Sequence, residues 1–371
     1  MTKSDDKRVP ALRFKGFTDE WEQRKLGEIS NIIAGGDKNI NKIKKYGKYP
    51  VIANSINKNG IVGYYDNEYR VKAPAVTVTG RGEIGHAVAR FQNFTPIVRL
   101  LALSSKLDPI FLANSINKIR FFNESTGVPQ LTKPQLSTYS IIIPSVEEQN
   151  NIGKLILLIE KYIHLQQRKL KLLKVMKKAL SQYMFCQEIE FVPILRFNSF
   201  SDKWKYERLK NLIVKEIKGK AKADMKGTKS TYIDTALLNG GSITKVDSPT
   251  DTFHNDIIIL WDGSQAGKIY HGFTGALGST LKSYKPKYSG GFLYQYLKSK
   301  EPIIFLRYRT PNIPHVVKDF TEIFKINVPS VKEQEKISKI LNYLDQSILV
   351  ETKKIGSIKK IKKFLLQNMF I

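Results

Sequence analysis

The sequence predicts an α+β protein in which two similar α/β domains are separated by a long antiparallel two-helix coiled coil. Two internal repeats support this prediction. Residues 141–185 return as residues 326–370, 185 positions later and without a gap, and both copies end in Met-Phe. Residues 10–26, PALRFKGFTDEWEQRKL, return as residues 193–209, PILRFNSFSDKWKYERL. The chain is therefore expected to contain two copies of one unit, related by a pseudo-twofold internal repeat.

Each domain is predicted to consist of short strands and turns with a few short helices. Apolar runs of strand length, bounded by turn residues, occur at 49–55, 74–80, 86–91, 256–263 and 321–328. Short helices are expected near 109–121 and 291–299. The predicted boundaries are an N-terminal segment at 1–18, a first domain at 19–143, a first spacer helix at 144–186, a second domain at 193–328 and a second spacer helix at 329–371.

Both long helices begin with the same pattern, a proline and a serine followed by a glutamate. Ser145 lies three residues before Glu148, and Ser330 lies three residues before Glu333. This spacing predicts a capping box, in which the hydroxyl accepts a hydrogen bond from a free backbone N–H and the carboxylate reaches back to the cap residue. Each helix is expected to run about 40 residues, or roughly 60 Å.

An apolar stripe follows each predicted helix. Residues at a- and d-type spacing include Tyr162, Met176, Ile340 and Ile361. The stripe is broader than these positions, so it predicts burial against more than a two-stranded seam. The residues that widen it are Ile156, Ile163, Leu170, Met184, Leu341, Ile348 and Ile355. The opposite face is rich in lysine, which is either solvated or in direct contact with phosphate groups. The residues predicted to pack the helices are Ile152, Ile159, Leu173, Leu180, Ile337, Leu344, Ile358 and Leu365.

The composition favours a polyanionic partner. The formal net charge is +28, and the isoelectric point is near 9.8. Nucleic acid is favoured over a membrane surface because the basic residues are spread along the chain. The single cysteine, Cys186, excludes an intrachain disulfide and a cysteine-based metal site. No signal peptide or membrane-spanning run is apparent, so we expect a cytoplasmic protein.

Motifs for catalysis or cofactor binding are incomplete in this sequence. Gly80 to Gly85 matches the dinucleotide fingerprint GxGxxG, but a strand-like run follows where the phosphate site needs a helix. The run from Gly263 to Lys268 is one residue short of a phosphate-binding loop, and Ile269 replaces the required Ser or Thr. The five histidines lack metal-binding spacing. The sequence therefore predicts no catalysis, no metal and no cofactor bound by this chain.

Polar residues at loop tips remain as candidates for contacting DNA bases. Loops 125–130 and 310–315 correspond at the offset of 185, so that Gln130 matches His315. Arginine, asparagine and glutamine can make bidentate contacts to purine edges, although any one of these residues can also be a solvated loop residue. The candidates are Lys58, Arg81, Thr126, Gln130, Ser264, Gln265, Arg309, Asn312 and His315.

The paired P-S-V-x-E-Q helix starts, the PxLRFxxFxDxW motifs and the two variable stretches between them resemble the specificity (S) subunit of bacterial type I restriction–modification systems. The resemblance implies that each domain is a target recognition domain for one half of a bipartite site in double-stranded DNA, and that the helices set the spacer. It further implies two modification subunits, which use S-adenosylmethionine to methylate adenine, and restriction/translocase subunits, which use ATP and Mg²⁺. In that family the S subunit is not catalytic, and the cofactors belong to its partners.

Two other functions stay open from the residues alone. A stand-alone DNA-binding nuclease needs a cluster of metal-binding carboxylates, which the sequence does not reveal. A basic coiled-coil adaptor for acidic proteins accounts for the helices and the charge, but it leaves the duplicated domains without a role. Co-purification of an adenine methyltransferase, expected at two per chain from the repeat symmetry, distinguishes these functions.

Overall fold

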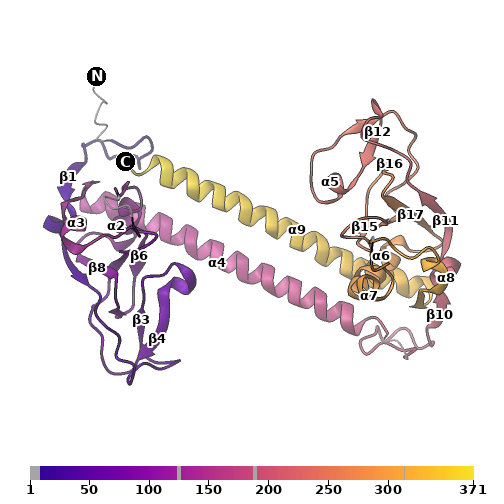
Figure 1. The fold of residues 1–371 in the computed structure, drawn as a ribbon, viewed down its shortest axis with the longest axis horizontal. Helices are drawn as coiled ribbons and strands as arrows, with labels where there is room; N and C mark the ends of the chain where they lie inside the picture. Colours follow the sequence, from indigo (N-terminus) through magenta and orange to yellow (C-terminus); the bar gives the residue numbers. More distant parts are fainter. Residues whose placement is uncertain (1–8, 123–126, 187–189, 313) are drawn as a thin grey trace. The chain divides into compact units, whose positions relative to one another are not determined.

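The computed structural model describes residues 9–122, 127–186, 190–312 and 314–371. The chain divides into two compact units (Figure 1). Unit 1 consists of Met1–Gln167 and Lys354–Ile371, and unit 2 consists of Arg168–Lys353. The two long helices are α4 (Val146–Tyr183) and α9 (Val331–Asn368), and each has 38 residues. Each unit therefore contains the start of one long helix and the end of the other.

Three sheets make up the globular part of unit 1. A four-stranded antiparallel sheet has the order β2-β8-β5-β6, a three-stranded sheet has the order β4-β3-β7, and β1 pairs with β9. The elements are β1 (Glu22–Lys25), α1 (Leu26–Ile29), β2 (Ser30–Ala34), β3 (Tyr49–Ile52), η1 (Asn57–Gly60), β4 (Ile61–Tyr65), β5 (Ala75–Thr79), β6 (Ala87–Arg90), β7 (Thr95–Pro96), β8 (Leu100–Ser105), α2 (Pro109–Ile116), α3 (Lys133–Thr138) and β9 (Ser140–Ile143).

Unit 2 repeats this topology. The order β11-β17-β14-β15 corresponds to the four-stranded sheet of unit 1, β13-β12-β16 to its three-stranded sheet, and β10-β18 to its β1-β9 pair. The elements are β10 (Lys205–Arg208), η2 (Leu209–Leu212), β11 (Ile213–Lys218), β12 (Lys226–Ile233), α5 (Thr235–Leu238), β13 (Lys245–Val246), β14 (Ile257–Leu260), β15 (Ile269–His271), β16 (Ala276–Leu277), β17 (Leu281–Pro286), α6 (Gly290–Ser299), α7 (Glu301–Arg307), α8 (Phe320–Ile323) and β18 (Lys325–Val328). The predicted α+β class and internal repeat are confirmed.

The central strands of both sheets form because their residues are apolar or β-branched on both faces. All five residues of β5, AVTVT, and all four residues of β14, IIIL, are buried. One predicted strand is wrong in part: of residues 321–328, only Lys325–Val328 forms a strand. The preceding residues form α8, because helical bonds bring the rings of Phe320 and Phe324 to 5.0 Å from each other in the core.

The long helices pair antiparallel within each unit. In unit 1, Glu160 of α4 bonds to Lys362 of α9 at 2.6 Å, while Tyr162 lies under Lys354. In unit 2, Lys177 of α4 bonds to Asp345 of α9 at 2.5 Å. The two ion pairs occupy corresponding positions, since Glu160 and Asp345, like Lys177 and Lys362, are 185 residues apart. The helix pairing thus follows the internal repeat.

The residues predicted to pack the helices are all at least half-buried, and so are the residues that widen the stripe beside them. Ile152, Ile337 and Leu344 are buried, and the half-buried ones are Ile159, Leu173, Leu180, Ile358 and Leu365. Several other residues at a- and d-type positions are exposed, among them Tyr162, Met176, Ile340 and Ile361. The residues that widen the stripe are buried or half-buried, as expected: Ile156, Ile163, Leu170, Met184, Leu341, Ile348 and Ile355. The buried face of each helix is therefore broader than the a and d positions alone.

The capping prediction is half right. The Ser145 hydroxyl accepts a hydrogen bond from the Glu148 backbone N–H at 3.4 Å, whereas the Glu148 carboxylate does not return to the cap. It instead accepts two bonds from Arg13, 2.9 Å from Nε and 2.7 Å from Nη2. Arg13 belongs to the PALRF motif, so the two repeated motifs of unit 1 meet in space. These bonds raise the pKa of Arg13 above its ordinary value.

Unit 2 contains the same arrangement. Arg196 of the PILRF motif donates from Nε and Nη2 to Glu333, both at 2.8 Å, and Glu333 is buried. A bidentate pair between a buried carboxylate and a guanidinium is a stronger partner than the solvated end of a helix, which explains why the carboxylate turns away from the cap. The repeated segments 10–26 and 193–209 are called the leading motifs. The Arg13–Glu148 and Arg196–Glu333 pairs therefore attach each leading motif to the start of a long helix.

Candidate nucleic-acid interface

In unit 1, the turn between β5 and β6 lies against residues 129–131. The Gly82 N–H donates to the Pro129 carbonyl at 3.0 Å, and the Leu131 N–H donates to the Gly80 carbonyl at 2.9 Å. Arg81 and Gln130 are consequently partners in an antiparallel β-bridge. Two candidate residues that are 49 positions apart in sequence thus lie side by side on the surface.

The turn between β14 and β15 of unit 2 is held in the same way. The Gly263 N–H donates to the Pro314 carbonyl at 2.9 Å, and the Val316 N–H donates to the Trp261 carbonyl at 3.0 Å. Asp262 and His315 are the bridge partners here. The predicted correspondence of Gln130 with His315 therefore coincides with an identical backbone arrangement that carries different side chains.

Two further residues, Asn54 and Arg99, shape the surface of unit 1. The Asn54 side chain accepts from the Gly80 N–H at 2.7 Å and donates to the Arg81 carbonyl at 2.8 Å, which fixes the turn. Arg99 donates from Nη1 to Gln130 Oε1 at 2.9 Å. Gly80 is required at this point, because a Cβ there would lie 2.4 Å from the Arg99 carbonyl oxygen. Arg99 follows an apolar run, and no sequence signal linked it to Gln130.

The candidates of unit 2 form a second cluster. Arg309 donates to the Ser264 carbonyl at 3.1 Å, and its guanidinium lies 4.9 Å from the ring centre of Phe305. Gln265 Oε1 accepts from Lys268 at 2.9 Å. His315 is half-buried, with Nδ1 3.1 Å from the Thr310 hydroxyl.

The remaining candidates lie apart from these contacts. Asn312 is exposed in the segment that carries Arg309 and His315. Lys58 is exposed in the turn η1 with a positive φ of 49°. Thr126 lies outside the described residues. The structure therefore brings together Arg81 with Gln130, and Arg309 with Ser264, but it does not join Lys58 to either cluster.

Behind the unit 1 turn, a small polar recess contains a half-buried cation. Arg90 at the end of β6 donates from Nε to the Thr77 hydroxyl at 2.9 Å. Thr79, His86 and Asn59 line the same recess. Burial lowers the pKa of Arg90 to about 10, so the guanidinium is still charged at neutral pH. Its positive charge adds to that of Arg81 and Arg99 on this side of the sheet.

The glycine motifs have a structural role in these turns. The run after Gly80–Gly85 is the strand β6, as predicted, and Gly82 and Gly85 adopt φ values of 75° and 83°.

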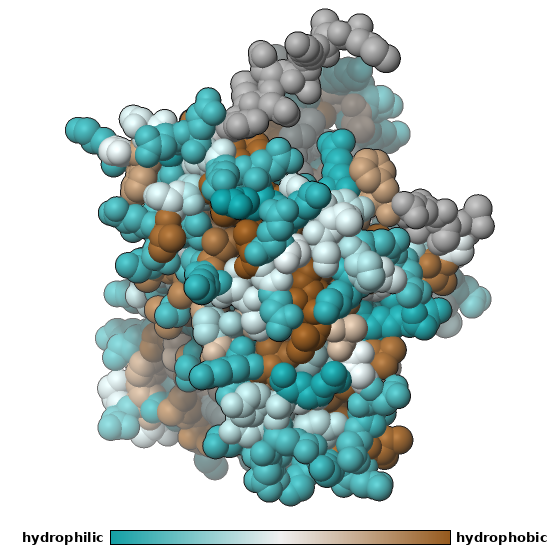
Figure 2. Space-filling view, turned by 90° about the vertical axis from the view of Figure 1, so that its left-hand side faces the viewer, coloured by the Kyte–Doolittle hydropathy of each residue, from teal (hydrophilic) through white to brown (hydrophobic). Residues whose placement is uncertain are grey.

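Within the described residues, no group of three or more His, Cys, Asp or Glu side chains could hold a metal ion. No helix in this part of the chain is long and apolar enough to cross a membrane. The face of unit 1 in Figure 2 is largely hydrophilic with scattered apolar groups.

Comparison with known proteins identifies the relatives of this chain. The family model "Type I restriction modification DNA specificity domain" matches twice, at residues 18–175 and 201–360. The specificity subunit of the type I restriction enzyme MjaVIII from Methanocaldococcus jannaschii is 34% identical over 178 residues, covering 45% of this chain and 42% of that protein. A type I specificity subunit from Mycoplasma pneumoniae is 30% identical over 151 residues, covering 39% of this chain and 45% of that protein. The chain thus spans less than half the length of these curated relatives.

Solved structures share the fold over nearly the whole chain. The crystal structure of the S subunit of a type I restriction–modification system from M. genitalium superimposes with a TM-score of 0.75 at 17% identity, covering 98% of this chain and 99% of that one. A chain from a study of complex assembly and conformational transition in a type I system gives a TM-score of 0.52 at 14% identity, covering 97% and 99%. With both repeats matched by the family model, the chain belongs to the family of type I restriction–modification DNA specificity proteins.

Proposed function

We propose that this chain is the DNA sequence-specificity subunit of a type I restriction–modification complex and that each unit reads one half of a bipartite site in double-stranded DNA. The observation that carries the proposal is the duplicated β-bridge. One backbone arrangement presents Arg81 with Gln130 in unit 1 and Asp262 with His315 in unit 2. A shared framework with different side chains is what two readers of two different half-sites require.

The side chains suit base recognition in the major groove. In unit 1 the Gln130 carbonyl oxygen is held by Arg99, which leaves its NH₂ group and the exposed guanidinium of Arg81 as donors for purine acceptors. In unit 2, Arg309 and His315 supply the donors, and Asp262 can accept from a cytosine amino group. The net charge of +28 supports phosphate contacts, which position the protein without reading sequence.

The long helices are proposed to set the distance between half-sites and to dock two modification subunits. Their exposed apolar side chains support the docking role, because a solvated helix pair does not need them. They include Leu165, Leu172, Val175, Tyr343 and Phe364, which are 56 to 72% exposed. In this proposal the chain supplies recognition, while S-adenosylmethionine, ATP and Mg²⁺ act on the modification and restriction/translocase subunits. A target in chromosomal DNA implies the cytoplasm as the compartment.

The experiment is genome-wide mapping of methylated adenines in cells that carry single-unit variants. Arg81→Ala with Gln130→Ala is expected to relax one half-site, because each bidentate base contact contributes about 1–3 kcal/mol of discrimination. Arg309→Ala with His315→Ala is expected to relax only the other half. Arg24→Ala, an exposed arginine of β1, is the control and should leave both halves unchanged. An equal effect of the first two variants on both halves, or DNA cleavage by the purified chain alone, would refute the proposal.

A further inference from the structure

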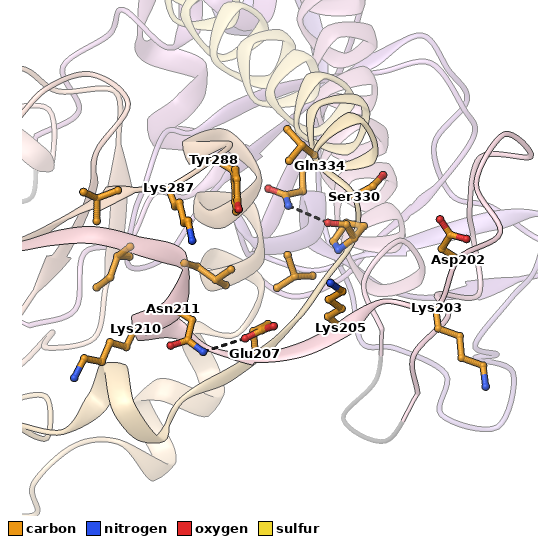
Figure 3. A pocket seen from close by; sticks show the side chains of 16 residues that line it. Asp202, Lys203, Lys205, Glu207, Lys210, Asn211, Lys287, Tyr288, Ser330 and Gln334 are labelled. Carbon is orange, nitrogen blue, oxygen red and sulfur yellow. Dashed lines mark hydrogen bonds between the residues drawn. The ribbon is translucent and has the colours of Figure 1, made fainter.

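A groove in unit 2 lies between the start of α9 and the strand β10 (Figure 3). Its volume is about 970 Å³, near the upper end of the range for small-ligand sites. The turn η2, the start of β11 and the residues after β17 complete its walls. Apolar side chains from two of these elements line it, Ile213 and Val214 of β11 and Val331 of α9. The groove therefore offers room and apolar surface for an extended segment of several residues.

The charged residues of the groove leave a positive excess. Lys203, Lys205, Lys210 and Lys287 line it together with two carboxylates. Lys210 forms an ion pair with Glu322, which lies outside the groove, and the Glu207 carboxylate accepts a bond from Asn211 at 3.0 Å. The other three lysines have no acidic partner among the residues that the structure describes. An anionic group entering the groove would thus meet ammonium groups that have no acidic partner.

The corresponding surface of unit 1 has the opposite charge. The strand registers define the correspondence: Glu22 is paired with Ile143 as Lys205 is paired with Val328. At the offset of 183 positions that relates residues 10–26 to 193–209, Glu20 stands for Lys203, Arg24 for Glu207 and Glu28 for Asn211. The strand pairing places Lys106 where unit 2 has Lys287, so the net negative charge of the unit 1 surface comes from its four carboxylates, Asp19, Glu20, Glu22 and Glu28. The apolar wall differs as well, since Ser30 and Asn31 replace Ile213 and Val214. The same framework therefore carries a basic apolar groove in unit 2 and an acidic polar surface in unit 1.

The groove is remote from the candidate nucleic-acid interface of the same unit. Strand β17 begins at Leu281, which pairs with Leu260 beside the β14–β15 turn. It ends at Pro286, which pairs with Ile213 in the wall of the groove. Five residue steps along a strand span roughly 16 Å, so the two surfaces lie at opposite ends of the sheet. Together with the apolar wall, this location favours a protein segment over a DNA backbone.

We propose that the unit 2 groove binds an acidic, partly apolar segment of a partner protein and that the unit 1 surface does not, so that the duplicated chain has one such site instead of two. The carboxylates of the segment pair with Lys203, Lys205 and Lys287, and its apolar side chains lie against Val214 and Val331. The inference does not depend on DNA reading by either unit. It predicts that a partner protein bound at unit 2 contacts this groove, whereas a partner protein bound at unit 1 makes no such contact at the corresponding surface.

The test measures binding of a fluorescein-labelled peptide of alternating glutamate and leucine to the full chain by fluorescence anisotropy. Lys203→Glu with Lys205→Glu should weaken binding about tenfold, because two attractions become repulsions. Lys226→Glu with Lys229→Glu is the matched control: both lysines are exposed on β12, and the change in net charge is the same. The control should change affinity by no more than about twofold, the scale of a long-range charge effect.

A second variant tests the apolar wall without a change in charge. Val214→Asn introduces the residue found at the corresponding position of unit 1, and Val214 is 65% exposed, so the fold should tolerate it. A several-fold loss of affinity is expected. Isothermal titration should give one peptide per chain. The proposal would be overturned by absence of peptide binding, by equal losses of affinity in the two lysine double variants, by binding of two peptides per chain, or by displacement of the peptide by duplex DNA. A change of half-site reading in the Arg81 variant bears on the proposed function and not on this groove.

Discussion

The two tryptophans of the leading motifs should differ in their contribution to stability, although they occupy corresponding positions. Trp21 and Trp204 are both 2% exposed. Trp21 donates from Nε1 to the buried Glu148 carboxylate at 3.2 Å. Among the described residues, the Nε1 atom of Trp204 has no hydrogen-bond partner. Replacement by phenylalanine therefore breaks a bond to a charged group in unit 1 and only removes an unpaired N–H in unit 2.

The difference can be estimated from the chemistry of the two sites. Loss of ring area is common to both variants and cancels in the comparison. A hydrogen bond to a charged group contributes about 1.5–3 kcal/mol, whereas removal of an unpaired buried donor is neutral or slightly stabilising. We therefore expect Trp21→Phe to lower the free energy of local unfolding by at least about 1.5 kcal/mol more than Trp204→Phe does. This difference corresponds to roughly tenfold or more in the opening equilibrium.

Native-state hydrogen exchange measures this difference in each unit separately. Exchange of amides in peptides covering residues 10–26 and 193–209 should accelerate in the variant of the same unit and stay unchanged in the other. Because the comparison is made within one chain, differences in sample handling affect both segments alike. Equal acceleration of the two segments by their own variants would show that the bond from Trp21 to Glu148 adds no stability, and the reasoning would fail.

Two further predictions concern acid stability and helix length. Burial lowers the pKa of His271 to about 4. Between about pH 6.5 and 4, the unfolded chain therefore binds more protons than the folded chain does. Unit 2 should lose roughly 1–2 kcal/mol of stability as the pH falls through that window, a value that allows for the partial exposure of the ring. His271→Phe, which preserves the stacking on Tyr294, should remove this slope in thermal unfolding curves, and an unchanged slope would contradict the assignment. Insertion of seven residues after Arg168, together with seven before Lys354, lengthens both helices by two turns, or roughly 10.5 Å. The DNA spacer between the two methylated half-sites should then lengthen by about three base pairs, while the half-sites stay unaltered. A constant spacer in the methylation map would exclude the helices as its determinant.

Sequence reasoning succeeded where the signal was local or repeated. The helix starts at Val146 and Val331 follow from proline and serine, and the hairpin turns follow from glycines that adopt positive φ, such as Gly82. The equivalence of Gln130 and His315 came from counting positions. In each case the determining residues lie within a few positions of each other, or the same pattern occurs twice.

Contacts between distant segments could not be predicted in this way. The bond from Arg99 to Gln130 joins residues far apart in the sequence, and so do the bonds from Asn54 to the Gly80–Arg81 turn. No sequence motif links the partners of these bonds. The capping box was wrong in its second half for a related reason. Glu148 satisfies the local pattern, but Arg13 competes for its carboxylate from 135 positions away and offers two charge-assisted bonds.

The internal repeat also explains why each half of the chain needs the end of the other. Met184, Phe185 and Cys186 follow α4, yet they are buried in the core of unit 2 with Trp204 and Phe292. Met369 and Phe370 follow α9 and are buried in unit 1 with Trp21 and Phe111. Removing either pair would leave apolar cavities in a core that the rest of its own half cannot fill, at a cost of about 3–5 kcal/mol for each phenylalanine. The Met-Phe repeat is therefore a packing requirement, and it couples the length of each helix to the integrity of the unit that receives its end. The loops around Arg81 and Asp262 are free of that requirement, which is why they can differ while the helices match without a gap.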